Sequence, residues 1–275
     1  MSDKLSPLAP AQSPALPDIP GVTCRVARAR YKDWDRCDLT FVELAAGTTV
    51  AGVLTRSKCP SPEVEWCREA LQGGKARGLV VNAGNANAFT GARGKEAVQL
   101  ILSLASDHLG CAENEILVSS TGVIGVPLPT DKAKAGLKEA FAAQPCGWQD
   151  AAATIMTTDT FPKMATTSAV IGGTTVHLNG IIKGSGMIAP DMATMLGYIF
   201  TDATVEAAFL QQMLSAATAQ SFNCITVDSD TSTSDTVLVL ATAQSDAPAL
   251  TSFDDPGADA FQAALSDLCM QLAHL

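Results

Sequence analysis

The sequence predicts a layered α/β sandwich, and three observations support this fold class. Short segments rich in Val, Thr, Leu and Phe alternate with longer segments in which apolar residues recur at helical spacing. Of the 275 residues, 47% are hydrophobic and 17% are charged, so the chain can bury a large core in one or two domains. No internal repeat or long low-complexity tract follows residue 20. Mixed segments of this kind favour a sandwich over an all-helical bundle.

The first half of the chain alternates between the two kinds of segment. Residues 78–82 form an apolar run that ends in a Gly/Asn loop, which is typical of a buried strand. Thr130 stands at the start of a periodic segment and is a candidate N-cap. The expected strands are 22–31, 38–44, 49–54, 78–82 and 116–119, and the expected helices are 62–76, 93–109 and one that begins near Thr130.

The second half is expected to contain a hairpin and a further strand pair. Residues 165–183 indicate two strands joined by a turn, either at Gly172-Gly173 or at Asn179-Gly180. Both dipeptides suit a two-residue turn, so the sequence leaves the choice open. The other expected elements are a helix that starts after Thr204 and runs to about residue 220, and strands over 222–228 and 235–242.

The last segment has the pattern of an amphipathic helix. Phe261, Leu265, Leu268 and Leu272 fall on one helical face. The chain stops at Leu275 without a capping glycine or a polar tail. This pattern fits either a docked terminal helix or a truncated chain.

Residues 1–20 are expected to form a disordered arm, because prolines recur there among Ala, Ser and Asp. The arm lacks a basic start followed by an apolar stretch, so a secretory signal is not expected. A net charge of -10 argues against nucleic acid or an anionic membrane as partner. No run approaches the roughly 20 apolar residues of a membrane span. The prolines are Pro7, Pro10, Pro14, Pro17 and Pro20.

Cysteine and histidine usage indicates a protein with reduced thiols and no metal site. The eight cysteines are scattered without a C-x-x-C pair, which favours a cytoplasmic location over a disulfide framework. No cysteine lies at metal-ligand spacing from any of the three histidines, which are His108, His177 and His274.

The segment from Lys183 to Leu196 carries the most unusual pattern, Gly-Ser-Gly followed by a proline and then a threonine in apolar surroundings. One interpretation is a Gly-rich turn that leads into a buried strand. A phosphate-binding loop does not fit, because Lys183 precedes the glycines. The other interpretation is an autoproteolytic nucleophile, in which cleavage before Thr194 frees its α-amine to act as the base. An α-amine has an unperturbed pKa of about 7.7–8.0, and this chemistry needs no histidine.

Two further segments could contribute to a site. Ser119–Gly125 follows an expected strand and offers a hydroxyl and backbone amides at a turn. Such donors stabilise oxyanions, and the loss of one typically costs about 10²–10³ in rate. The alternative is an ordinary turn capped by threonine. Asn82–Asn87 is likewise either a turn-rich loop or a wall of the site.

Four stretches resemble the bifunctional ornithine acetyltransferase / N-acetylglutamate synthase family, the ArgJ family. They are Asn82–Gly91 (NAGNANAFTG), Ser120–Gly125 (STGVIG), Lys183–Leu196 (KGSGMIAPDMATML) and Ser221–Leu238 (SFNCITVDSDTSTSDTVL). The resemblance implies a layered α/β sandwich of the ornithine acetyltransferase (DmpA/ArgJ-like) type. It implies a likeness to N-terminal-nucleophile hydrolases in mechanism only. Asp191 departs from the family pattern, which often has Asn there.

The resemblance implies a self-cleaving precursor. Cleavage between Ala193 and Thr194 divides the chain into an α-chain region, 21–193, and the N-terminal part of a β-chain region, 194–275. Thr194 then takes the acetyl group from N-acetylornithine and passes it to glutamate in a ping-pong reaction. By the family's pattern, Thr121 and Gly122 form the oxyanion hole, and Thr158, Lys183 and Thr194 contact the substrate.

The resemblance further implies that no metal or organic cofactor is needed and that some members use acetyl-CoA as a second acetyl donor. The α and β chains are expected to pair in a cytoplasmic hetero-tetramer that binds neither nucleic acid nor membrane. Family members continue past the position of Leu275, and that part would supply a Glu and other polar residues to the pocket. Two alternatives stay open: a threonine-nucleophile aminopeptidase or amidase, and an inactive truncated remnant.

Overall fold

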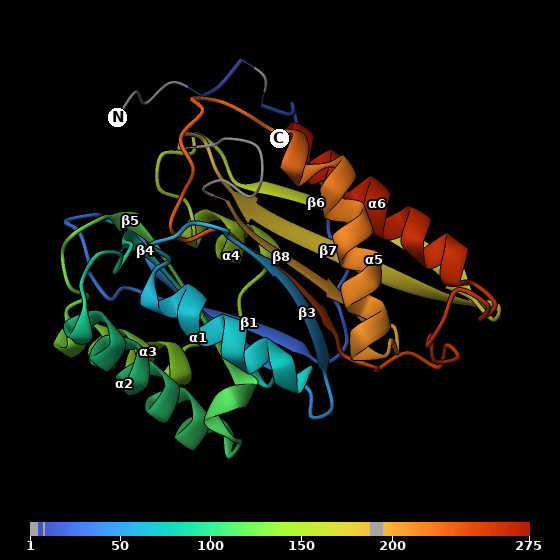
Figure 1. Cartoon of the computed structure of the whole chain (residues 1–275), viewed down its shortest axis with the longest axis horizontal. Coiled ribbons are helices and arrows are strands. Elements are labelled where there is room, and N and C mark those ends of the chain that lie inside the picture. Colours follow the sequence, from blue (N-terminus) through green and yellow to red (C-terminus); the bar gives the residue numbers. More distant parts are fainter. Residues whose placement is uncertain (1–4, 8, 188–194) are drawn as a thin grey trace.

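Two β-sheets lie face to face at the centre of the molecule (Figure 1). The computed structural model describes residues 5–7, 9–187 and 195–275. The first sheet contains, in order, β1 (Val22–Ala27), β2 (Leu39–Leu44), β4 (Gly78–Asn85) and β5 (Ile116–Val123). The second sheet contains, in order, β3 (Thr49–Leu54), β9 (Thr236–Ala241), β8 (Leu196–Thr201), β7 (Thr174–Lys183) and β6 (Lys163–Ile171).

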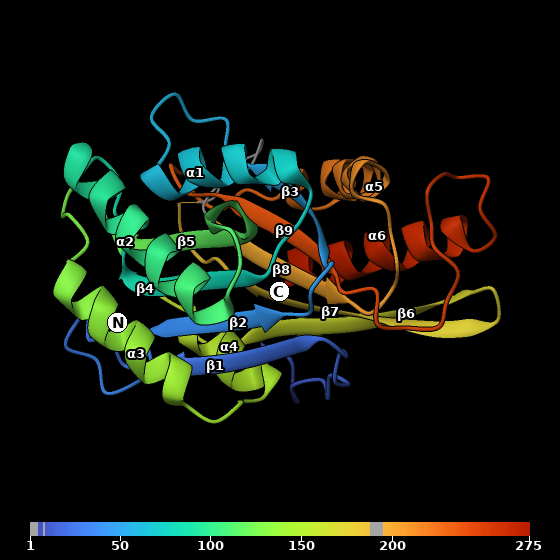
Figure 2. The same cartoon turned by 90° about the horizontal axis from the view of Figure 1, so that it is seen from below.

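Helices cover the outer face of each sheet (Figure 2). Three pack on the first sheet: α1 (Pro62–Ala70), α2 (Ala92–Leu109) and α3 (Thr130–Ala142). Two pack on the second sheet: α5 (Ala207–Gln220) and α6 (Ala258–His274). The short α4 (Trp148–Thr154) contacts β1 of one sheet and β6 and β7 of the other. The predicted layered α/β sandwich is confirmed.

The second sheet is buried on both faces because its central strands alternate between two cores. Tyr198 and Phe200 of β8 belong to the core between the sheets, whereas Ile199 belongs to the core beneath α5 and α6. Successive side chains of a strand point to opposite faces. All residues of β8 are buried. The Gly-rich run is therefore followed by a buried strand that begins at Leu196, as one of its two interpretations predicted.

Local sequence signals explain several element ends. Ser61 caps α1 and accepts a hydrogen bond from the Val64 amide, with Pro62 in the first helical turn where its missing N–H costs nothing. The β6–β7 hairpin turns at Gly172 and Gly173, whose φ angles are 57° and 87°. Two residues with positive φ are the requirement of a type I′ turn. Of the two proposed turns, the one at Gly172-Gly173 is therefore correct.

Three local predictions were wrong. Residues 222–228 do not form a strand, because β9 already pairs with β3 on one side and β8 on the other; Phe222–Cys224 is instead a short 3₁₀ helix. Thr130 does not cap α3, since Pro129 occupies the N-cap position and no side-chain cap bond forms. The predicted strand 22–31 ends at Ala27.

The arm expected to be disordered is anchored at its C-terminal end. Ile19 is 2% exposed and belongs to the core between the sheets. The Pro17 carbonyl accepts hydrogen bonds from Trp148 Nε1 at 3.0 Å and from Asn179 Nδ2 at 2.6 Å. Proline lacks an N–H but keeps its carbonyl acceptor. The expectation of disorder is therefore corrected for residues 17–20.

The two predicted chain regions form one folding unit. β8 and β9 follow residue 194 in the chain, yet they lie between β3 and β7 in the same sheet. β9 pairs in parallel with β8 and antiparallel with β3. A break of the chain near residue 194 would leave both pieces joined by strand pairing. Among the described residues, no helix has the length and apolar composition of a membrane span.

Candidate active site

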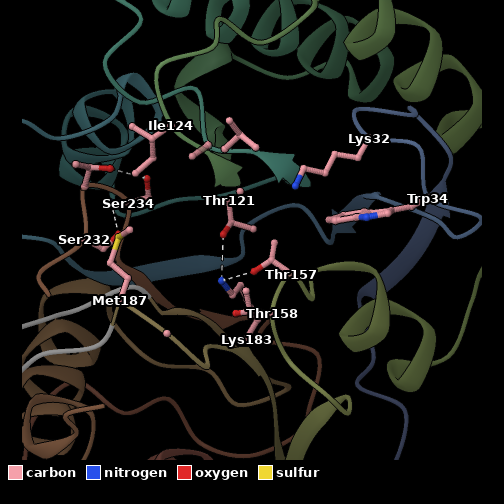
Figure 3. A pocket seen from close by; sticks show the side chains of 15 residues that line it. Lys32, Trp34, Thr121, Ile124, Thr157, Thr158, Lys183, Met187, Ser232 and Ser234 are labelled. Carbon is pink, nitrogen blue, oxygen red and sulfur yellow. Dashed lines mark hydrogen bonds between the residues drawn. The ribbon is translucent and has the colours of Figure 1, made fainter. Parts of the chain in front are cut away.

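A cavity of about 360 Å³ is lined by residues from both sheets and from the loops between them (Figure 3). The first sheet contributes the end of β5, and the second contributes Lys183 at the end of β7. The remaining wall comes from the loop before β2, Ala86 after β4, the turn after α4, the segment after β7 and the loop before β9. The segments concerned are Lys32 with Trp34, Thr121–Ile124, Thr157–Thr158, Gly186–Met187 and Ser232–Ser234.

Thr121 and Gly122 lie in the cavity wall, at the end of β5. This strand runs parallel to β4, with Thr121 beside Ala83 and Gly122 beside Gly84. Gly122 has a φ of 133°, and a Cβ there would lie 2.3 Å from the Gly84 carbonyl carbon. Only glycine permits this conformation and this close approach of two backbones. The close approach fixes the place where the predicted oxyanion donors stand.

Lys183 joins the two sheets at the cavity. Its ammonium donates hydrogen bonds to Thr121 Oγ1 at 3.1 Å and to Thr157 Oγ1 at 3.0 Å (Figure 3). The side chain is 2% exposed, and this burial lowers its pKa although the charge of Asp159 opposes the shift. Thr158, which the sequence suggested, lines the cavity, but its neighbour Thr157 makes the bond.

An ion pair holds the chain immediately after Lys183. Lys163 Nζ lies 3.1 Å from Asp159 Oδ1 and also donates to the Gly184 carbonyl, while the Gly184 amide donates to Asp159 Oδ1 at 2.8 Å. Burial alone would raise the pKa of Asp159, but Lys163, Lys183 and the Gly184 amide together hold it below its ordinary value. The carboxylate therefore stays charged and fixes the start of the Gly-rich segment. Sequence reasoning missed both Asp159 and Lys163.

A buried acid network supports β5 from behind the cavity. Glu63 Oε1 accepts from Asn87 Nδ2 at 2.9 Å and lies 2.7 Å from Ser120 Oγ, which is 2.6 Å from Asn82 Oδ1. The Ser120 hydroxyl has one proton for two oxygens. Burial raises the pKa of Glu63, although the hydrogen bonds from Asn87 and Ser120 oppose this shift. Of the run 82–87, only Ala86 lines the cavity, so this run mainly supports the wall.

Asp235 reaches the residue that follows the predicted nucleophile. It is fully buried, and its Oδ1 accepts a hydrogen bond from the Met195 amide at 2.8 Å. Burial raises the pKa of Asp235 to about 8, because the Met195 amide and the charge of Lys183 compensate only in part. Ser234, the residue before Asp235, lines the cavity.

Thr194, Ala193 and Asp191 lie outside the described residues. On one side of them Met187 lines the cavity, and on the other side the Met195 amide is bound by Asp235. Both described flanks are thus tied to the region that holds Thr121 and Lys183. Within residues 5–7, 9–187 and 195–275, no group of three or more His, Cys, Asp or Glu side chains is arranged to hold a metal ion.

Comparisons of the sequence and of the structure with known proteins both point to the same family. The model described as "ArgJ family" matches residues 23–275. The arginine biosynthesis bifunctional protein ArgJ of Zymomonas mobilis is 58% identical over 274 residues, which is 100% of this chain and 67% of that protein. The structure of the ornithine acetyltransferase of Mycobacterium tuberculosis, complexed with ornithine, has a TM-score of 0.52 and 26% identity. It covers 65% of this chain and 94% of that chain.

A likeness of fold alone extends further. The L-aminopeptidase D-Ala-esterase/amidase of Ochrobactrum anthropi, described as a variant of the Ntn hydrolase fold, has a TM-score of 0.53 and 12% identity. It covers 93% of this chain and 83% of that chain. The likeness to N-terminal-nucleophile hydrolases was expected in mechanism only, so that expectation is corrected.

Proposed function

Because the chain belongs to the ArgJ family, we propose that it is an acetyltransferase of arginine biosynthesis that moves an acetyl group from N-acetylornithine to glutamate. The chain spans 67% of the length of its Zymomonas mobilis relative. One observation supports the proposal above the others. The residue after Thr194, Met195, is hydrogen-bonded to Asp235, and Asp235 directly follows Ser234 in the wall of the cavity that contains Thr121 and Lys183.

The proposed chemistry begins with cleavage between Ala193 and Thr194, which frees the Thr194 amine. That amine takes the proton of the Thr194 hydroxyl as the oxygen attacks the acetyl carbonyl of N-acetylornithine. The oxyanion is stabilised by the Gly122 amide and the Thr121 hydroxyl. The carbon–nitrogen bond then breaks, and ornithine leaves with the proton. The glutamate amine attacks the acetyl ester next, which regenerates the Thr194 hydroxyl.

Incubation with isotopically labelled N-acetylornithine tests this proposal. We expect mass spectrometry to place the labelled acetyl on Thr194 at the new N-terminus, and glutamate to remove it. T194A is expected to stay as one uncut band and to take up no label, whereas T194S keeps a hydroxyl and should retain some labelling. A label on another side chain would contradict the assignment of the nucleophile.

Lys183 is proposed to hold the substrate carboxylate beside the reacting atoms. K183M removes a buried charge that is bonded to Thr121 and Thr157, so we expect the acetyl-transfer rate to fall about 10²-fold or more. Burial lowers the pKa of Lys183, so its ammonium loses its proton at a lower pH than an ordinary lysine does. As the pH rises, the affinity of the wild type for glutamate should therefore decline before the ordinary lysine range is reached. Steady-state kinetics from pH 7 upward measure both effects, and T157V, which removes only one acceptor, is the milder comparison. An unchanged rate in K183M would remove Lys183 from the site.

Further parts of the proposal concern the acetyl donor and the assembly. The name of the Zymomonas mobilis relative includes the word bifunctional, so we propose that acetyl-CoA is a second acetyl donor. Replacement of N-acetylornithine by acetyl-CoA in the transfer assay tests this. The reaction is proposed to need no metal or organic cofactor, and the α and β pieces are proposed to form a cytoplasmic hetero-tetramer. Native mass spectrometry of the processed protein measures that composition.

A further inference from the structure

The loop between β1 and β2 is built around one buried carboxylate. Asp38, 1% exposed, accepts hydrogen bonds from three successive backbone amides: Ala29 at 2.7 Å, Arg30 at 3.2 Å and Tyr31 at 2.7 Å. Arg30 takes a positive φ of 59° within this arrangement. Three amide donors on one carboxylate fix the backbone up to the residue before Lys32. The position of Lys32 is therefore set by the fold.

Two further contacts direct Lys32 to the cavity. A Cβ on Gly84, at the end of β4, would touch Lys32 Cγ and Trp34 Cζ3 at 3.4 Å, so the loop packs closely on that strand. The Lys32 ammonium lies 5.3 Å from the centroid of the Trp34 ring, a cation–π distance. In Figure 3 Lys32 extends toward Thr121, while Lys183 reaches Thr121 from the opposite side of the view.

The described cavity wall carries two positive charges and no carboxylate. Lys32 and Lys183 both line it, and none of the other lining residues is Asp or Glu. Lys183 already donates to two hydroxyls, whereas Lys32 makes no hydrogen bond or ion pair with a described residue. An ammonium that faces a cavity without an anionic partner attracts a carboxylate from a ligand.

We propose that Lys32 is the specificity-determining residue that binds the side-chain carboxylate of the acetyl acceptor, glutamate. This inference rests on the proposed function. Lys183 is buried and bonded to Thr121, so it marks the reacting end of the cavity, whereas Lys32 is half-buried and lies nearer solvent. The α-amine and α-carboxylate of glutamate share one carbon. When the amine is at the reacting end, the side-chain carboxylate points outward, toward Lys32.

The same charge distinguishes the two amino acids that use the cavity. Ornithine carries an ammonium at the end of its side chain, where glutamate carries a carboxylate. Lys32 attracts the second and repels the first, with the interaction strengthened because the cavity is partly shielded from water. Lys32 therefore promotes the exchange of released ornithine for glutamate once Thr194 is acetylated.

Calorimetric titration with glutamate and glutamine tests the inference, because glutamine has nearly the same shape without the side-chain charge. We expect K32M to weaken glutamate binding about tenfold or more and to leave glutamine binding within about twofold. In the labelling assay, K32M should acetylate Thr194 from N-acetylornithine at least as fast as the wild type does, because N-acetylornithine carries the same side-chain ammonium that Lys32 repels. Its acetyl-enzyme should then need more glutamate to be discharged at half the maximal rate.

K32R and K138M are the matched controls. K32R keeps the charge and should bind glutamate nearly as wild type does, whereas K138M removes the same charge from the exposed face of α3 and should change neither affinity. Equal weakening of both ligands in K32M, unchanged glutamate binding, or no glutamate binding by the wild type would overturn the inference. Failure of the proposed function gives a different result, because Thr194 would then carry no label in the wild type or in either Lys32 variant.

Discussion

Replacing Gly122 by alanine is expected to lower the rate of acetyl transfer by about 10²–10³-fold, while the chain still folds. The new Cβ would lie 2.3 Å from the Gly84 carbonyl carbon and 2.6 Å from the Asn85 nitrogen. Both are backbone atoms, so no side chain can move aside. The φ of 133° is also unfavourable for alanine. The ends of β4 and β5 must separate, which displaces the proposed oxyanion donors.

The same change is expected to lower the free energy of unfolding by about 1–3 kcal/mol, from backbone strain and overpacking. G125A is the matched control, because Gly125 has a φ of 83° but nothing within 4 Å of its would-be Cβ. It isolates the cost of the backbone angle from that of the collision. Denaturant unfolding and transfer kinetics measure both variants. Equal loss of activity in G122A and G125A would show that the contact with β4 is not what positions the site.

The sequence predicted the parts of the site that lie in short local motifs. Thr121 and Gly122 follow a strand signal, and Lys183 begins the Gly-rich run, so each could be found within a few residues. The bond between Lys183 and Thr121 joins residues 62 positions apart, on different sheets. Thr157 and Asp159 follow α4, a helix of seven residues that has too few turns to show a period. Their roles depend on packing between distant segments, which local patterns do not encode.

Strand pairing shows the same division between local and long-range information. The core of the run 235–242 is a continuous apolar stretch, Val237–Ala241, flanked by threonines, so β9 was predicted nearly at its true ends. Its partners were not, because β3 lies far earlier in the chain and β8 follows the Gly-rich segment. Lys32 and Asp38 were missed for a related reason. A lone lysine in a polar loop has no sequence signal. Only the three backbone amides that donate to Asp38 in the structure reveal that the loop is ordered.

Asp235 is expected to make the stability of the chain fall as the pH rises from about 4 to about 8. Its pKa is raised by burial from 3.8 to about 8 in the folded state, so the folded chain binds this proton more tightly than the unfolded chain does. The stabilisation is complete below the unfolded pKa and is lost as pH rises through the folded value. Within that window, one proton corresponds to about 1.4 kcal/mol per pH unit.

D235N separates this effect from the other titrating groups. Asparagine has the shape of the protonated acid, so its oxygen still accepts from the Met195 amide, but it has no charge to lose. We expect the variant to match the wild type below about pH 4 and to become progressively more stable than it toward pH 8, as measured by urea unfolding at each pH. A constant difference across the range would mean that Asp235 does not titrate there. Asp235 binds the amide of Met195, which follows Thr194 in the chain. The labelling rate of the wild type is therefore expected to change over this window, while that of D235N does not.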